Sequence, residues 1–398
     1  MLKFLHNILI FREEYITIYV IVIFDNCFSV LAISGKKGYL MATFRKIGVL
    51  TSGGDAPGMN ACIKAVVNRA LEMGIEVVGV VGGYAGLING DLIPMTQKSV
   101  GSCMGIGGTI LYSSRCPEFK TEEGMQAAIA TCKKEGIDAL VCIGGDGTFR
   151  GATDMTLRGI PSIGLPGTID NDITATDYTI GLDTSINTAV QMIDDLRDTC
   201  ESHARLNVVE VMGRDCGQIA LYAAIASGAV AVAVPEVPFD EAAAIQKIAA
   251  LRQAGKRGMI VVVSEGMKNP DGTAYAETLR KKIEAETGVE TKFARLAHVV
   301  RGGKPTVRDR ATAAEMAVKA VELLVEGKSN VVMCMLDDQV VPVDIHFALI
   351  ADRMYKNKLR EGDLDDFSEA EIAQMQALAQ KRRDEIATLY KVAQNVGF

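Results

Sequence analysis

The sequence lacks several patterns that would assign its class at once. No two of its nine cysteines form a C-x-x-C pair, and it has no long run of lysine or arginine, no internal repeat and no low-complexity tract. A nucleic-acid-binding protein normally shows a basic patch, so these features and the net charge of −7 predict no nucleic-acid partner. Cysteines scattered in apolar surroundings favour buried, reduced thiols and therefore a reducing, cytoplasmic compartment.

Length and composition describe a globular protein. The chain has 398 residues, which is too long for one hydrophobic core and fits two domains of ordinary size. Its hydrophobic fraction of 48% and charged fraction of 23% are typical of globular chains.

Residues 1–40 differ from the rest of the chain. They contain the apolar run YITIYVIVIF, which an acidic pair precedes and two polar residues follow. Polar residues in those places suit neither a membrane span nor a signal peptide. Met41 opens MATFRKIGVLTSGGD, where a cytosolic domain would begin. We expect translation of the working protein to start at Met41, with no membrane partner; a membrane anchor is the alternative.

From residue 46 onward the pattern alternates between short β-branched runs and helical stretches. Continuous Val/Ile runs between helices predict parallel sheet covered on both faces. The predicted class is α/β, with ligands at the carboxyl ends of the strands. The runs include IGVLTS, EVVGVV, ALVCIGG, LNVVEVM and MIVVVS.

The C-terminal residues predict one long helix. Ser368 and Glu371 have the spacing of a capping box, and apolar side chains recur on one face from Ile372 to Ala379. A stripe of this kind usually docks onto its own domain or a sister subunit.

Two glycine-rich loops follow predicted strands and lead into helices. In Gly53–Gly58 and Gly144–Thr148 the glycines let the backbone approach a phosphate at a helix N-terminus. The first loop alone is equally consistent with a tight turn. In the second, Asp146 can hold Mg²⁺, and Thr148 can cap the helix or meet a phosphate. This GGDGT motif predicts a phosphoryl-donor site, which lipid and NAD kinases share.

A third loop, Pro166–Asp172, carries two carboxylates. Asp170 can accept a proton from a hydroxyl while Asp172 organises a metal or its partner carboxylate. An Asx-type turn is the structural alternative. Isolated arginines are usually solvated, but four in loop contexts suit a doubly phosphorylated reaction centre. They are Arg115, Arg205, Arg214 and Arg301, with His298 close to the last.

Together these residues resemble the bacterial-type ATP-dependent 6-phosphofructokinases. The motifs TSGGDAPGMNA, GGTIL-x-SSRCPEF, IGGDGT, GLPGTIDNDI, TDYTIG, EVMGR and RGG-x-P-x-x-x-DR occur in the family's order. The resemblance implies two Rossmann-like three-layer α/β/α domains with largely parallel sheets, and a homotetramer with active sites shared between subunits. The implied parts are a larger ATP-binding domain (41–180 plus about 300–345), a smaller fructose-6-phosphate-binding domain (181–299) and a C-terminal helical segment (346–398).

The resemblance also implies the reaction and its residues. The reaction is phosphorylation of fructose 6-phosphate at the 1-hydroxyl by ATP with Mg²⁺, the committed step of glycolysis, with Asp170 as general base. The implied catalytic residues are Asp170, Arg214, Thr168 and Asp172. The implied ATP site is Gly54, Arg115, Cys116, Gly145, Asp146, Gly147 and Thr148, with Asp146 on the metal. The implied sugar-phosphate contacts are Thr168, Ile169, Asp170, Arg205, Met212, Gly213, Arg214, Glu265, Lys292, His298 and Arg301.

The choice of phosphoryl donor depends on two glycines. Pyrophosphate-using relatives tend to carry Asp and Lys where this chain has Gly147 and Gly167, so both positions favour ATP. Lys292 stands where the family has an arginine. It keeps the charge but loses the planar fork, which predicts weaker sugar-phosphate binding. A pyrophosphate-dependent enzyme and a non-catalytic nucleotide-binding paralogue remain as alternatives.

The effector site that the resemblance implies is more altered. Lys64, Lys98, Arg197 and Lys256 match basic positions. Asn68 and Ala254 stand where basic residues are common, and Val230 replaces an acid. The sequence therefore predicts weak or absent classical allosteric regulation.

Overall fold

The structure is a computed structural model. It describes the backbone of residues 6–12, 15–24, 27–36 and 44–397, and side chains from residue 44 to residue 397. The chain divides into two units, one made of residues 1–43 with 325–327 and the other of the remaining residues.

Three strands form a separate small sheet near the N-terminus. The strands β1 (His6–Arg12), β2 (Tyr15–Phe24) and β3 (Cys27–Lys36) pair antiparallel in chain order. The apolar run is thus a strand, and no helix in the described ranges is long and apolar enough to span a bilayer. The predicted start at Met41 lies outside the described residues, and the expectation about residues 1–40 stays a prediction.

The larger sheet of the main unit has seven strands in the order β14-β13-β8-β7-β4-β5-β6. The five inner strands are parallel, and β6 and β14 pair antiparallel at the edges. Each edge strand contains a proline, which is tolerated there because an edge has a free side. The strands are β4 (Lys46–Thr51), β5 (Glu76–Val80), β6 (Leu92–Met95), β7 (Ala139–Gly144), β8 (Ser162–Pro166), β13 (Val331–Leu336) and β14 (Gln339–Asp344).

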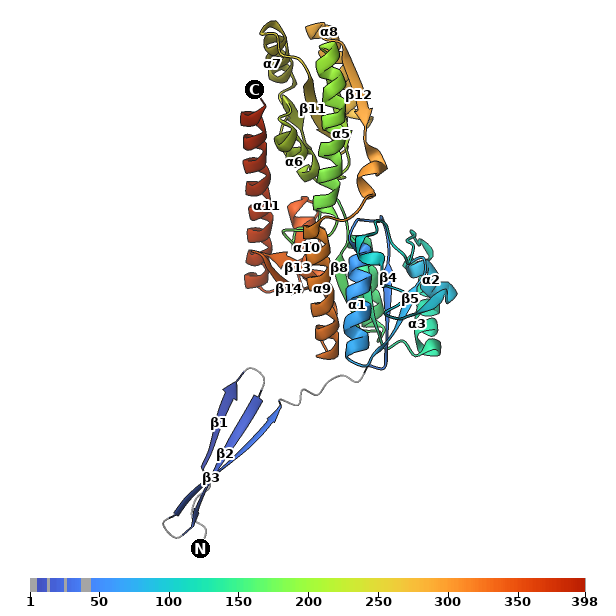
Figure 1. Cartoon of the computed structure of the whole chain (residues 1–398), viewed down its shortest axis with the longest axis vertical. Coiled ribbons are helices and arrows are strands. Elements are labelled where there is room, and N and C mark those ends of the chain that lie inside the picture. Colours follow the sequence, from blue (N-terminus) through green and yellow to red (C-terminus); the bar gives the residue numbers. More distant parts are fainter. Residues whose placement is uncertain (1–5, 13–14, 25–26, 37–43, 398) are drawn as a thin grey trace. The chain divides into compact units, whose positions relative to one another are not determined.

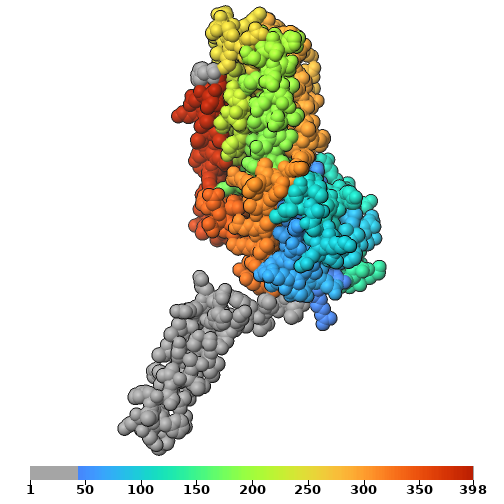
Figure 2. Space-filling view, in the orientation of Figure 1, coloured from blue at the N-terminus to red at the C-terminus, as the bar shows by residue number. Residues whose placement is uncertain are grey.

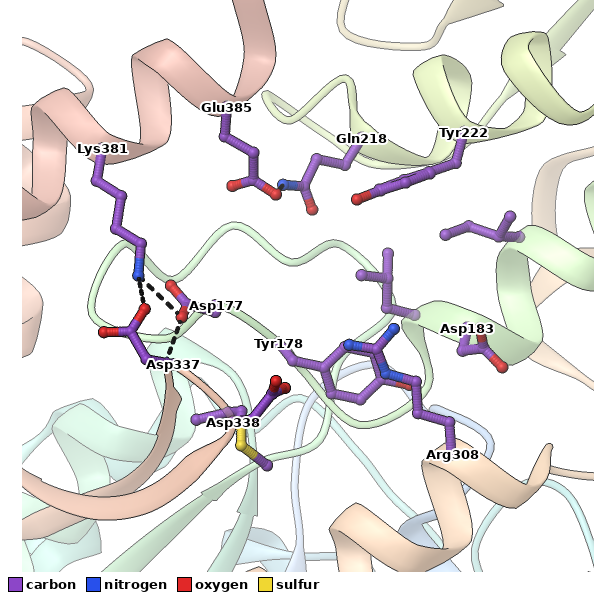
Figure 3. A pocket seen from close by; sticks show the side chains of 13 residues that line it. Asp177, Tyr178, Asp183, Gln218, Tyr222, Arg308, Asp337, Asp338, Lys381 and Glu385 are labelled. Atoms are coloured by element: carbon purple, nitrogen blue, oxygen red, sulfur yellow. Dashed lines mark hydrogen bonds and ion pairs between the residues drawn. The ribbon is translucent and has the colours of Figure 1, made fainter. Parts of the chain in front are cut away.

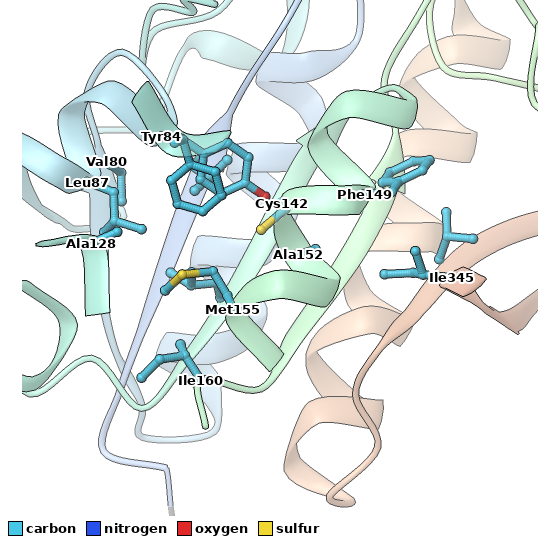
Figure 4. Packing of buried hydrophobic residues seen from close by; sticks show 14 of the residues in the cluster. Val80, Tyr84, Leu87, Ala128, Cys142, Phe149, Ala152, Met155, Ile160 and Ile345 are labelled. Carbon is cyan, nitrogen blue, oxygen red and sulfur yellow. The ribbon is translucent and has the colours of Figure 1, made fainter. Parts of the chain in front are cut away.

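Helices cover both faces of this sheet (Figure 1). Leu140 and Cys142 of β7 face one core cluster, which Phe149 and Met155 of α4 also fill (Figure 4). The next residue of β7, Ile143, faces the opposite side, where a Cβ added at Gly167 would meet both Ile143 and Met59 of α1. The helices of this part are α1 (Met59–Glu72), α2 (Tyr84–Asn89), α3 (Glu122–Glu135), α4 (Asp146–Leu157), α9 (Val307–Val325) and α10 (Ile345–Tyr355), with 3₁₀ turns η1 (Cys103–Gly105), η2 (Glu118–Lys120) and η3 (Ala297–Arg301).

The second sheet has four parallel strands in the order β10-β11-β9-β12. Every residue of β9 and β11 is buried, as the continuous Val/Ile runs predict. The strands are β9 (Leu206–Val211), β10 (Ala231–Ala233), β11 (Met259–Ser264) and β12 (Thr291–Arg295), and the helices are α5 (Leu182–His203), α6 (Gln218–Ser227), α7 (Glu241–Gln253) and α8 (Tyr275–Thr287). The predicted α/β class with largely parallel sheets is confirmed.

The C-terminal helix α11 (Glu369–Val396) docks onto its own chain. Ser368 and Glu371 form the predicted capping box, and Met375 and Ala379 are buried. The helix contacts α10, α6 and β10. In Figure 2 its red surface runs beside the yellow-green surface that includes α6.

Candidate active site

The two glycine-rich loops and the loop with the two carboxylates meet because they follow neighbouring strands. They come after β4, β7 and β8, which are adjacent in the sheet, so the loops gather at its carboxyl edge. They line two adjoining cavities of about 350 and 600 Å³, which share Gly53, Gly54, Arg115, Arg214 and Arg301. The first cavity also contains Cys116, Gly145, Asp146, Gly147, Thr148, Thr168, Asp170 and Asp172, and the second contains Met212, Glu265 and His298.

Asp170 is the most enclosed acid of the site, with 1% of its surface exposed. Its Oδ2 lies 3.1 Å from Nε of Arg214, and its Oδ1 lies 3.7 Å from Nη2 of Arg301. Oδ1 has no hydrogen-bond donor. Burial and the neighbouring Asp172 raise the pKa of Asp170, and the two arginines oppose that rise. The carboxylate therefore combines an open acceptor position with increased basicity.

The loop around Asp170 is fixed by its own side chains. The N–H of Asp170 donates to Oγ1 of Thr168 over 3.2 Å, and that hydroxyl lies 3.4 Å from Asp170 Oδ2. A hydroxyl that bonds the backbone two residues on is a common turn device. The next residue, Asn171, has a φ of +47°, a backbone conformation that residues with a Cβ rarely adopt. A turn made by the Thr168 hydroxyl therefore sets the direction of the two carboxylates. The predicted division of roles between Asp170 and Asp172 stays a prediction.

Arg214 reaches the site from the loop after β9. Its φ is +51°, and one oxygen of Glu265 accepts the N–H groups of both Gly213 and Arg214 over 3.1 and 2.9 Å. The guanidinium extends past Asp170 toward Asp172, whose Oδ2 lies 3.8 Å from Nη1. About 54% of the side chain is exposed, so it remains open to a ligand.

Arg301 closes the opposite side of Asp170. Its Nη1 donates to the carbonyl oxygen of Asp55 over 3.0 Å. A Cβ at Gly54 would lie only 2.8 Å from that Nη1, so the glycine makes room for the guanidinium. Gly54 thus has a packing role in addition to its predicted place in a phosphate loop.

Asp146 is the first residue of α4, where a helix N-terminus favours anions. Burial, followed by the charges of Asp352 and Asp172, raises the pKa of Asp146 to about 7. Within residues 44–397, no group of three or more His, Cys, Asp or Glu side chains is placed to hold a metal. Mg²⁺ commonly binds through one or two carboxylates, with waters and phosphates completing its shell. Asp146 in the first cavity fits such a cation.

Two residues beside Asp172, namely Lys356 and Asp352, were not predicted from the sequence. Nζ of Lys356 lies 2.8 Å from Oδ2 of Asp352 and 3.7 Å from Oδ2 of Asp172, and it donates to the carbonyl oxygen of Asp172 over 3.1 Å. Burial lowers the pKa of Lys356, but the two aspartates outweigh that and raise it. The only sequence signal was an i,i+4 acid–base pair, which normally marks an exposed helix surface.

Two predicted sugar-phosphate residues lie away from both cavities. Nε of Arg205 and Nζ of Lys292 each lie 2.8 Å from an oxygen of Glu290. The arginine and then the lysine lower the pKa of Glu290 to about 2. Their predicted role at a neighbouring subunit's site stays a prediction.

Two other predicted residues serve packing. Ile169 is fully buried, and a Cβ at Gly167 would lie 2.9 Å from Ile143. Among the predicted effector residues, Lys64 donates to the carbonyl oxygen of Gly101 and Arg197 to that of Gly258.

Parallel sheets with glycine loops at helix N-termini, a buried carboxylate and converging arginines define a protein suited to phosphorylated ligands. The phosphofructokinase family model matches residues 46–324. ATP-dependent 6-phosphofructokinase 1 of Clostridium perfringens is 51% identical over 317 residues, covering 80% of this chain and 98% of that protein. The ATP-dependent 6-phosphofructokinase of Clostridium tetani is 48% identical with the same coverage. The chain belongs to the phosphofructokinase family.

Solved structures agree with this assignment. Phosphofructokinase from Saccharomyces cerevisiae matches with a TM-score of 0.73 and 32% identity, over 81% of this chain and 47% of the yeast chain. The chain thus spans about half the length of that protein. Pyrophosphate-dependent phosphofructokinase from Marinobacter aquaeolei matches with a TM-score of 0.66 and 21% identity, over 76% of this chain and 83% of that one, which shows the fold alone.

Proposed function

We propose that this protein is an ATP-dependent 6-phosphofructokinase, which transfers the γ-phosphoryl group of ATP to the 1-hydroxyl of fructose 6-phosphate. The observation that carries the proposal is Asp170. It is a buried carboxylate with an oxygen that lacks a donor, between two arginines in the cavity that also contains the GGDGT loop. Relatives about half identical to this chain, named ATP-dependent 6-phosphofructokinases, support it.

The mechanism begins with a proton transfer. Asp170 accepts the proton of the sugar hydroxyl as the oxygen attacks the γ-phosphorus in line. The raised pKa of Asp170 makes it a better base than an ordinary aspartate, and the charges of Arg214 and Arg301 favour its ionised form. Arg115 and Arg214, which line both cavities, stabilise the charge that spreads over the transferring oxygens.

Asp146 would hold the metal. When bound, Mg²⁺ neutralises charge on the phosphate oxygens. Beside it, Gly147 has open space where a side chain would project, because no atom lies within 4 Å of an added Cβ. That space suits the α-phosphate of a nucleotide, and this supports ATP over pyrophosphate as the donor.

The second cavity is the proposed fructose 6-phosphate site. Met212, Glu265 and His298 line it together with Gly54 and Arg115. We assign ATP binding to the part built on the seven-stranded sheet and sugar-phosphate binding to the part built on the four-stranded sheet. Arg205 and Lys292, which reach neither cavity of their own chain, support a homotetramer in which they serve a neighbour's site. The proposed location is the cytoplasm.

A turnover assay tests this function. Purified full-length protein is mixed with ATP, Mg²⁺ and fructose 6-phosphate, and the products are identified by ³¹P NMR. Appearance of ADP and fructose 1,6-bisphosphate supports the proposal. Binding of ATP without turnover would instead identify a non-catalytic nucleotide-binding paralogue.

A further inference from the structure

The C-terminal helix reaches the loop between β8 and α5, which carries the two carboxylates. Arg382 of α11 is only 5% exposed. Its Nη2 donates to the carbonyl oxygens of Thr176 and Ile173 over 2.6 and 3.4 Å, and its Nη1 lies 3.1 Å from Oε2 of Glu385. A buried arginine on carbonyl oxygens ties the helix to the end of this loop.

A second connection joins the same helix to the start of the loop. Oε1 of Glu385 accepts a hydrogen bond from Nε2 of Gln218 over 2.9 Å, and Oε1 of Gln218 accepts one from Nδ2 of Asn171. Gln218 and Asn171 are each 1% exposed. Figure 3 shows Glu385 and Gln218 facing each other at the edge of a cavity of about 460 Å³.

These hydrogen bonds form a relay from Glu385 through Gln218 to Asn171. The charge of Glu385 fixes the direction in which each group of the relay donates. An ionised carboxylate can only accept hydrogen bonds, so the NH₂ group of Gln218 must face it. The carbonyl oxygen of Gln218 must then face Asn171, which has to present its own NH₂ group. One carboxylate on α11 therefore sets the orientation of two buried amides. Both side-chain polar groups of Gln218 are used in this chain, and Oδ1 of Asn171 is left without a hydrogen-bond partner.

Asn171 is where the relay meets the reaction centre. It lies between Asp170 and Asp172 and has φ +47°. Its Nδ2 also donates to the carbonyl oxygen of Asp177 over 3.3 Å. Asn adopts this left-handed conformation more readily than most residues with a Cβ, and the hydrogen bonds of its side chain hold it there. The two carboxylates on either side take their direction from that backbone.

We propose that Glu385, Gln218 and Arg382 are positioning residues for the general base, acting through Asn171. The relay holds the left-handed turn, and the turn aims Asp170 at the sugar hydroxyl. This inference rests on the proposed function, and it gives the C-terminal helix a part in turnover.

An exchange of the two polar partners tests the relay. In Gln218→Glu two carboxylates face each other, and neither can donate. Because small displacements of a reacting group can cost up to about 10²-fold in rate, we expect kcat to fall about tenfold, with KM for both substrates within about twofold of wild type.

In the double variant Q218E/E385Q, the carboxylate introduced at position 218 accepts from Asn171 and from the amide introduced at position 385. A carboxylate at the first position of α6 also suits the helix dipole. The kcat of the double variant should return to within about threefold of wild type.

A matched control separates positioning from simple stability. Met375→Ala loosens the packing of α11 on α10 without touching the relay. It should lower Tm and leave kcat unchanged. Amide hydrogen exchange of residues 170–178 should be faster in Q218E and restored in the double variant. The inference is overturned if Q218E keeps wild-type kcat, if the double variant shows no recovery, or if M375A loses as much kcat as Q218E.

Failure of this inference can be told apart from failure of the proposed function. If the wild type does not turn over ATP and fructose 6-phosphate, the proposed function fails. The amide hydrogen exchange of residues 170–178 alone then tests whether the relay holds the loop. Unchanged exchange in Q218E would then refute it.

Discussion

Nε of Arg214 lies 3.1 Å from Oδ2 of Asp170, which joins a half-exposed cation to an acid that is 1% exposed. The two residues come from different sheets, since Asp170 follows β8 and Arg214 follows β9. The contact leaves Oδ1 of Asp170 without a hydrogen-bond donor. In the proposed mechanism, Asp170 thus accepts the proton while the neighbouring Arg214, held from the other sheet, stabilises the charge of the transferring phosphoryl group.

Replacing the base should stop turnover without removing the ligands. Asp170→Asn keeps the size of the side chain but cannot take a proton. We expect kcat to fall by about 10²–10⁴-fold, as is usual for loss of a general base. KM for ATP should stay close to that of the wild type. Steady-state kinetics of the two proteins provide the measurement, and a loss of less than about tenfold would assign the base elsewhere.

The pH profile should reveal the influence of Asp172 on Asp170. The base works only when ionised, so kcat falls as pH drops through its pKa. Burial and Asp172 raise that pKa above the ordinary aspartate value. Asp172→Asn removes one raising charge, so the acidic limb of log kcat should move to lower pH, whatever the change in maximum rate. A limb at unchanged or higher pH would argue against this electrostatic account.

Lys356 should matter most where the carboxylates are ionised. Lys356→Met leaves Asp352 and Asp172 without their shared cation, and breaking a buried pair typically costs about 3–5 kcal/mol. Because Lys356 is 17% exposed, we expect a loss of about 2–4 kcal/mol in the free energy of unfolding at pH 8.

The loss should shrink at low pH. The pKa of Asp352 is raised by burial, and without Lys356 it rises further, so the acid becomes neutral as pH falls through that value. Urea denaturation at pH 8 and pH 5 makes the comparison. Lys356→Arg keeps the charge and should stay near wild type at both pH values. Equal losses at both pH values would point to packing as the cause.

Gly147 should decide the use of ATP without affecting the fold. An added Cβ at Gly147 meets no protein atom within 4 Å, and Gly147 lies at an open cavity, so Gly147→Asp should leave Tm nearly unchanged. Its carboxylate would repel the α-phosphate, and we expect kcat/KM for ATP to fall by at least about tenfold. Gly147→Ala, which adds bulk without charge, is the control and should retain most of the activity. Wild-type ATP use by G147D would remove Gly147 from donor selection.

The sequence predicted the local parts of the site well. The GGDGT loop and Asp170 each follow a continuous buried strand, and neighbouring parallel strands bring such loops together. The capping box at Ser368 was also predicted from the sequence, because its signal lies within four residues. The position of a feature was predicted correctly where its whole signal lies within one short segment.

The parts that the sequence did not predict depend on contacts across long stretches of chain. Lys356 lies 184 positions from Asp172, and Arg382 lies 206 positions from Thr176. Arg382 lies on the buried stripe of α11 with Met375, Ala379 and Ile386, and Lys356 is the C-cap of α10. A cation in either place is normally solvated or at a helix end, so its local sequence gives no sign of a buried partner. Only the packing of α10 and α11 against the catalytic loop buries them.

The most direct measurement is a comparison of phosphoryl donors with full-length protein. Fructose 6-phosphate and Mg²⁺ are held saturating, ATP or pyrophosphate is added in turn, and fructose 1,6-bisphosphate is followed for wild type and D170N. The account predicts turnover by wild type with ATP, little or none with pyrophosphate, and near-complete loss in D170N. Turnover with pyrophosphate but not with ATP, or ATP-dependent turnover that D170N retains, would contradict it.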